Sequence, residues 1–222
     1  MSNLSDFMGG GGGLIVKREL FTANGTWTKP AGLKGGQVWV TMIGGGSAGN
    51  GSSSTEANGG NSGQFVQRLP VNVASETSVS VTVGAGGVGT GAVGGAGGVS
   101  SFGALVSCSG GVAPSALYRG NSDNSGGALG GLDFGSYGMV IGGTSPGGVF
   151  GGPPGLSRPN IGAGAGGLVL DGSGTTADQS GSNSFAGGGS GYGAGSGGHD
   201  SGASDSDDGA PGAVMIEWLE AV

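Results

Sequence analysis

Two spacings with possible chemistry overlap at residues 44–49, which read Gly-Gly-Gly-Ser-Ala-Gly. Glycines at the first, third and sixth positions match GxGxxG, whose backbone can cradle a phosphate, and Ser47 sits at the centre of a GxSxG pattern that can present a nucleophile. Both patterns require a helix to follow, but Asn-Gly-Ser-Ser-Ser-Thr follows here, which is typical of a turn. With 61 glycines in 222 residues, about four GxGxxG matches are expected by chance.

The remaining polar candidates are equally weak. The single histidine, His199, is the one possible base for Ser47, and it lies in a Gly/Ser/Asp stretch that is typical of solvated surface. An acidic cluster follows, formed by Asp200, Asp205, Asp207 and Asp208. Its spacing is not that of an EF-hand and no glutamate closes it, which favours a solvated loop over a calcium site. We expect no catalytic residue, no metal, no cofactor and no enzyme.

Large side chains stand out within the glycine-rich half of the chain. Aromatic residues and arginine supply most of the energy at recognition surfaces, and aromatic residues are also the natural core of a weakly apolar domain. Phe134 and Phe150 are predicted to be core. The predicted contact residues are Tyr118, Arg119, Tyr137 and Tyr192.

Composition excludes several classes of protein. The net charge is −7 and the seven Lys and Arg residues are scattered, which argues against binding of a nucleic-acid backbone. No apolar run approaches the roughly 20 residues of a membrane span, and no signal peptide is visible. Cys108 is the one cysteine, so no internal disulfide is expected. These features fit a protein made inside a cell.

The N-terminal part of the chain predicts strands. Residues 20–23 and 26–29 flank Asn24-Gly25, which predicts a β-hairpin because Asn-Gly suits a two-residue turn. Pro30 is expected to end the second strand. Val38–Ile43 is apolar at nearly every position, which predicts a central strand covered on both faces.

Four further segments have strand character: Gly63–Val73, interrupted by Pro70, then Ser78–Val83, Ser101–Ser107 and Gly212–Leu219. In Ser78–Val83 the valines alternate with Ser and Thr, as in a strand with one buried face. The last segment places Val214, Ile216 and Trp218 on one face, so we expect it to pair within the N-terminal sheet. No segment has helical periodicity.

Glycine tracts occupy Gly84–Val99 and most of Gly110–Gly212. Their spacing is not Gly-X-Y, so a collagen triple helix is excluded, but polyproline-type helices packed backbone against backbone are possible. The alternative is a disordered low-complexity region. We predict a mainly β fold with little or no helix, in which a small antiparallel framework anchors glycine-rich loops or polyglycine helices. Its parts are an N-terminal attachment arm or flexible tail (1–13), the β-framework (14–108 with 212–222) and a glycine-rich region (109–211).

The order of motifs resembles the glycine-rich domain of bacteriophage tail proteins. The resemblance rests on Phe21–Gly32, Val38–Gly46, Val81–Gly87, Ser101–Gly103 and Val214–Trp218. The middle region is more loosely similar to the distal adhesins of T-even-like phages, in which glycine-rich polyproline-type helices form a sandwich and their connecting loops touch the receptor. The resemblance carries no catalytic residue.

What the resemblance implies is a tail fibre or tail tip adhesin in the virion, made in the host cytoplasm. Its partners would be a bacterial surface receptor, either a saccharide or an outer-membrane protein, and other tail proteins. Residues 109–211 would be the receptor-facing region. A homotrimer is expected by analogy with phage fibres, although an adhesin of this kind can also be a monomeric cap. The main alternative is a structural virion protein that caps or joins a fibre. An ice-binding scaffold and an envelope enzyme are weaker alternatives.

Overall fold

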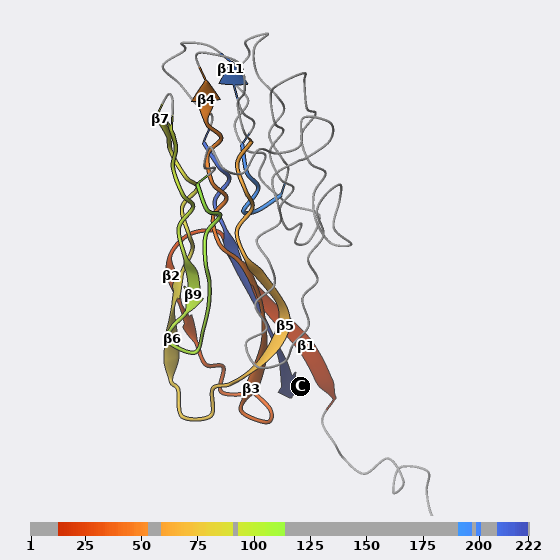
Figure 1. Ribbon diagram of the computed structural model, residues 1–222. Coiled ribbons are helices and arrows are strands. Elements are labelled where there is room, and N and C mark those ends of the chain that lie inside the picture. Colours follow the sequence, from red (N-terminus) through yellow and green to blue (C-terminus); the bar gives the residue numbers. More distant parts are fainter. Residues whose placement is uncertain are drawn as a thin grey trace, which may run out of the picture.

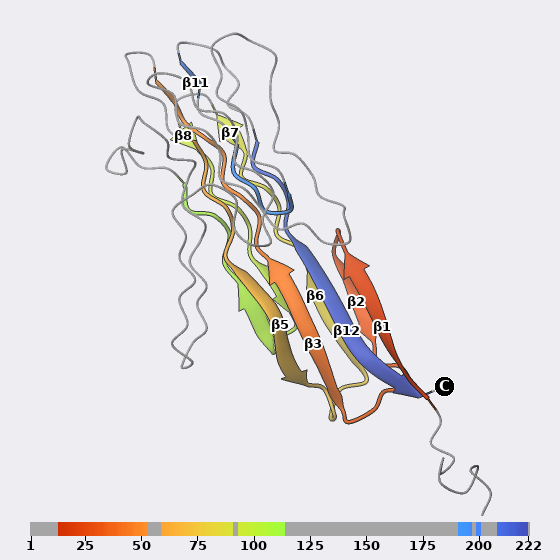
Figure 2. The same cartoon turned by 90° about the vertical axis from the view of Figure 1, so that its right-hand side faces the viewer.

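The computed structural model describes residues 13–52, 59–90, 93–113, 191–196, 199–200 and 208–221. These residues contain strands and no helix, which confirms the predicted mainly β class. Accordingly, none of them forms a helix that could cross a membrane. Two four-stranded antiparallel sheets lie against each other, and extended glycine-rich segments continue from one end of them (Figures 1 and 2).

The first sheet brings both ends of the described chain together. Its strands, in spatial order, are β1 (Leu14–Phe21), β12 (Ala213–Ala221), β3 (Gln37–Ile43) and β5 (Phe65–Asn72). The C-terminal strand therefore pairs within the N-terminal sheet, as predicted, and β3 is an interior strand.

The second sheet is built from shorter strands. Their order is β10 (Val106–Cys108), β9 (Ser100–Phe102), β6 (Ser78–Thr82) and β2 (Gly25–Thr28). The single strand predicted over Ser101–Ser107 is wrong, because these residues form the β9–β10 hairpin. Gly103 has φ +54° in its turn, a conformation that suits glycine.

The predicted hairpin at Asn24-Gly25 is also wrong. β1 and β2 belong to different sheets, and neither Asn24 nor Gly25 has the positive φ that a type I′ turn requires. Instead, Asn24 Oδ1 accepts a hydrogen bond from Val83 N at 2.8 Å. This contact ties the corner to the end of β6. The chain crosses between sheets here because Trp27, fully buried in β2, packs into the core shared by both.

Pro70 does not interrupt β5, contrary to the prediction. It lies opposite Trp39 within the strand, and β5 is an edge of the sheet, where a missing N–H is tolerated. The irregularity falls nearby instead, as a shift in register between Val40 and Met42.

The core between the sheets is apolar and aromatic. Trp27 makes edge-to-face contacts with Phe102, at 5.6 Å between ring centroids, and with Trp218, at 6.2 Å. Valines from β3, β5, β6 and β12 complete the cluster. The alternation predicted for β6 is confirmed, because Val79 and Val81 are buried between exposed neighbours.

The glycine segments hydrogen-bond with a period of three residues. In the buried segment 44–49, N–H groups three residues apart donate to the same neighbouring segment, while adjacent ones donate to different segments. The four bonds, donor first, are Gly44–Gln64, Ser47–Asn61, Gly45–Gly98 and Ala48–Gly95, all of 2.8–2.9 Å. Three residues per turn is the period of a polyproline II helix. An extended segment of this kind can bond to neighbours on all sides.

Segment 44–49 is the centre of this bundle. It also donates from Gly46 to Ala210, and its carbonyl groups accept hydrogen bonds from three more segments. Those donors are Gly87, Gly111 and Ser196. Glycine is required by close approach, because a Cβ at Gly45 would overlap the carbonyl oxygen of Ala85. The described glycine tracts thus lie outside the two main sheets as extended segments joined by backbone hydrogen bonds.

Buried serine hydroxyls complete the bundle. Ser100 Oγ accepts a hydrogen bond from Gly84 N at 2.9 Å and donates to Ile43 O at 2.7 Å, so it joins both sheets where the bundle begins. Ser196 Oγ accepts from Gly49 N at 2.6 Å. The sequence did not predict this role for Ser100 and Ser196, because a serine within a glycine tract is typical of a flexible linker.

Candidate functional site: the distal end of the glycine bundle

Short strands mark the end of the bundle that lies farthest from the two sheets, here called the distal end (Figure 1). They are β4 (Gly51–Ser52), β7 (Gly89–Thr90), β8 (Val93–Gly94) and β11 (His199–Asp200). β4 pairs with β11 in parallel, and β7 pairs with β8. Asp208 Oδ1 accepts a hydrogen bond from Gly89 N at 2.8 Å. Segments distant in sequence therefore meet at this end.

The opposite end, here called the basal end, holds both chain ends of the framework. Leu14 pairs with Ala221 there, at the start of β1 and the finish of β12 (Figure 2). By contrast, Ser52 and Asp200, which border stretches outside the described residues, lie at the distal end. The molecule thus has two ends of different character, with the two sheets and the bundle between them.

Three of the four predicted contact residues, Tyr118, Arg119 and Tyr137, lie outside the described residues, as do Phe134 and Phe150.

Tyr192 is described, and the structure places it in packing. Its side chain is 6% exposed and packs with Ile43 and Ala213 where the first sheet meets the bundle. Gly191 and Gly193 flank it with φ of +104° and +66°, conformations that glycine adopts without strain. A ring buried to this extent offers little surface to a receptor.

Residues 44–49 do not have the setting that either chemical motif needs. No helix follows them among the described residues, and the segment is enclosed by the bundle. Ser47 is fully buried, and its Oγ accepts a hydrogen bond from Asn61 N at 2.7 Å. The hydroxyl is therefore a structural acceptor within the bundle.

The acidic cluster is described in part. Asp200 lies in β11 and Asp208 contacts Gly89, whereas Asp205 and Asp207 lie outside the described residues. Among the residues that are described, no group of three or more His, Cys, Asp or Glu side chains is arranged to hold a metal ion.

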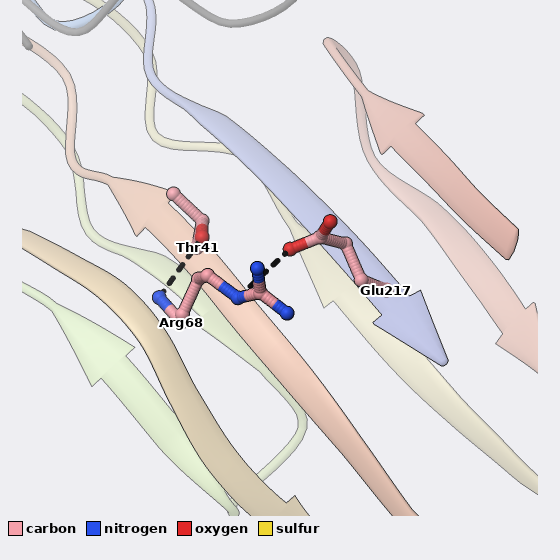
Figure 3. Close-up of polar contacts among 3 residues, drawn as sticks. All are labelled: Thr41, Arg68 and Glu217. Atoms are coloured by element: carbon pink, nitrogen blue, oxygen red, sulfur yellow. Dashed lines mark hydrogen bonds and ion pairs between the residues drawn. The ribbon is translucent and has the colours of Figure 1, made fainter. Parts of the chain in front are cut away.

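A polar cluster lies on the outer face of the first sheet (Figure 3). Arg68 has φ +47°, and its backbone N–H donates a hydrogen bond to Thr41 Oγ1 at 3.0 Å. Its Nε lies 3.5 Å from Glu217 Oε2, and its guanidinium carbon lies 5.7 Å from the ring centroid of Trp39. Positive φ in a non-glycine residue can mark a functional site. Here the backbone and side chain of Arg68 both have partners on neighbouring strands, which favours a structural role.

Cys108 is buried at the end of β10, and burial raises the pKa of its thiol to about 12. The thiolate is the reactive form of cysteine, so this side chain is inert at neutral pH.

Comparison with known protein families agrees with the motif order. A family model described as a glycine-rich domain matches residues 19–219. The match spans both sheets and the bundle, and the chain belongs to this family. No curated protein matches the chain.

Proposed function

We propose that the protein is a bacteriophage tail fibre or tail tip adhesin. The distal end would face a bacterial surface receptor, and the basal end would join other tail proteins. The observation that carries the proposal is the separation of these ends: the ends of β1 and β12 meet at one, and β4, β7, β8 and β11 lie at the other. The resemblance to tail proteins supports the same assignment.

The bundle suits this role because its backbones are closely packed and joined by many hydrogen bonds. Its segments hydrogen-bond to several neighbours each, and a Cβ at many of its glycines would meet backbone atoms. Recognition residues are best carried on loops that a rigid frame positions. The protein would be made in the host cytoplasm and act in the virion, without enzymatic activity or nucleic-acid binding.

Contact with the receptor, a saccharide or an outer-membrane protein, is assigned in this proposal to Tyr118, Arg119 and Tyr137. Tyr192 was predicted as a fourth contact, but its burial favours a supporting role. Ser109 and Gly111 hydrogen-bond within the bundle, so the receptor-facing region would begin beyond the described segment 109–113.

Adsorption to cells tests the proposal. Fluorescently labelled protein should bind intact cells of a susceptible strain and block phage adsorption. Alanine variants of Tyr118, Arg119 and Tyr137 should weaken binding by roughly 30-fold at an anchor position, without lowering the melting temperature. Lys34→Ala, at an exposed framework residue, is the matched control. Unchanged binding by all three variants would contradict the contact assignment, and no binding to any susceptible strain would contradict an adhesin.

The second candidate is a structural virion protein that caps or joins a fibre. The apolar residues exposed on β1 near the basal end favour it, namely Leu14, Ile15 and Val16. Presence in purified virions together with no binding to cells would select this function.

A further inference from the structure

β1 has an open edge that is unusual among the edges of the two sheets. In the described part of the chain, β1 pairs on one side, with β12. It is eight residues long and contains neither proline nor a register shift, and Leu14 and Val16 are 56% and 61% exposed. The other edge strands are protected: β5 carries Pro70 and the register shift lies at its pairing with β3, while β2 and β10 have four and three residues. A long edge strand with unpaired N–H and C=O groups is a template for another strand, and β1 carries apolar residues on both sides of its three central charges.

The sequence of β1 is self-complementary about Arg18. Around this residue, Ile15-Val-Lys and Glu-Leu-Phe21 place apolar residues at equal distances on both sides, with Lys17 and Glu19 as opposite charges. A two-fold axis perpendicular to the sheet at Arg18 would pair β1 with β1 of a second copy in antiparallel fashion, with equivalent faces aligned. The facing pairs would be Lys17 with Glu19, Val16 with Leu20, and Ile15 with Phe21, each formed twice. Such cross-strand pairs stabilise a sheet.

Neighbouring registers lack this complementarity. An axis at Lys17 would set Lys17 against itself and Ile15 against Glu19. An axis at Glu19 would set Glu19 against itself and Lys17 against Phe21. The register at Arg18 therefore gives the best match of charge and apolar character.

The one like-charged pair in the favoured register is Arg18 with itself. Within each copy, Arg18 lies directly opposite Glu217 in β12. Glu217 is also 3.5 Å from Arg68. The carboxylate beside each arginine reduces the repulsion across the axis.

We propose that the protein forms a two-fold dimer through antiparallel pairing of β1, which joins the first sheets of two copies into one continuous sheet. The interface is isologous, so one surface serves both copies. Because the paired strands run in opposite directions, the two glycine bundles project away from each other. This dimer goes beyond the proposed function and is an alternative to the trimer suggested by the resemblance.

Sedimentation velocity on the full chain tests the proposal. The parent protein should have twice the monomer mass of 20.6 kDa at micromolar concentration. Lys17→Glu and Glu19→Lys should each raise the dissociation constant by about tenfold or more, because each turns two attractive cross-strand pairs into repulsive ones. The double variant restores opposite charges and should return the dissociation constant to within about threefold of the parent. Lys34→Glu makes the same charge change away from the edge and should leave the dimer intact.

The outcomes separate the possible occupants of the edge. A monomer at all concentrations, including one whose own N-terminal residues cover β1, would overturn the proposal, and so would a trimer. A dimer that tolerates both single variants, or that the double variant does not restore, would also overturn it. Melting temperatures of all variants show whether the fold is retained, since Lys17 and Glu19 are exposed.

Discussion

A methyl group at Gly45 probes the close packing on which the bundle depends. A Cβ there would overlap the carbonyl oxygen of Ala85, a backbone atom that cannot rotate away. That oxygen already accepts a hydrogen bond from Gly98 N at 2.7 Å. Gly45 itself donates to Gly98 O at 2.9 Å and accepts from Gly111 N at 2.8 Å. Relief of the overlap must therefore disturb these three hydrogen bonds.

The cost of Gly45→Ala follows from these contacts. Each of the three backbone hydrogen bonds contributes about 1 kcal/mol net, and forced overpacking costs about 1–3 kcal/mol, so the free energy of unfolding should fall by about 4–6 kcal/mol. For a chain of this size that corresponds to a melting temperature lower by roughly 10–20 °C. Thermal unfolding followed by circular dichroism or calorimetry measures the shift.

Gly13→Ala is the matched control for this experiment. No heavy atom lies within 4 Å of a Cβ built at Gly13, and its φ is not in the left-handed region. We expect its melting temperature to stay within about 1 °C of the parent, as for most surface changes. If Gly45→Ala melts together with this control, the bundle is not packed backbone against backbone and the reasoning is refuted.

Three further changes test the framework and its junction. Trp218→Ala should lower the free energy of unfolding by about 3–5 kcal/mol, because it empties an aromatic site in the core. Ser100→Ala should cost about 1–3 kcal/mol, because Gly84 N and Ile43 O lose a buried partner; denaturant unfolding measures both. Cys108 should resist iodoacetamide at pH 8 while folded and react once urea unfolds the chain. Because its pKa rises from 9.0 to about 12 on folding, the folded state keeps the proton longer, and this contribution to stability is lost between those pH values.

The control for Ser100→Ala lies in the same β9–β10 hairpin. Ser107→Ala removes an exposed hydroxyl from β10 and should leave stability unchanged, so an equal effect of Ser100→Ala would contradict the junction role. Deletion of residues 212–222 should give insoluble or protease-sensitive protein. A deletion variant with the parent's melting curve would contradict the placement of β12. Rapid labelling of folded protein would show that Cys108 is accessible.

Local patterns were enough to predict the class of fold and several of the longer strands. Alternation at β6 and β12 and the apolar run at β3 identify buried faces, because a strand has a period of two whatever it pairs with. Close packing of the glycine tracts could also be expected from the sequence, because uncharged residues without side chains allow backbones to approach one another. The assignment of Tyr118, Arg119 and Tyr137 as receptor contacts rests on the sequence and the resemblance. All three lie outside the described residues.

Pairing partners were decided by tertiary structure. Asn24-Gly25 has the local character of a hairpin turn, but burial of Trp27 between the sheets takes β2 to β6, which lies about fifty residues further along the chain. Tyr192 and Ser100 carry no local sign of their environment. Their burial depends on β3, which is distant in sequence from both. Side-chain type and spacing determine which segments can be strands, whereas the competition for shared apolar cover and for backbone partners determines which segments meet.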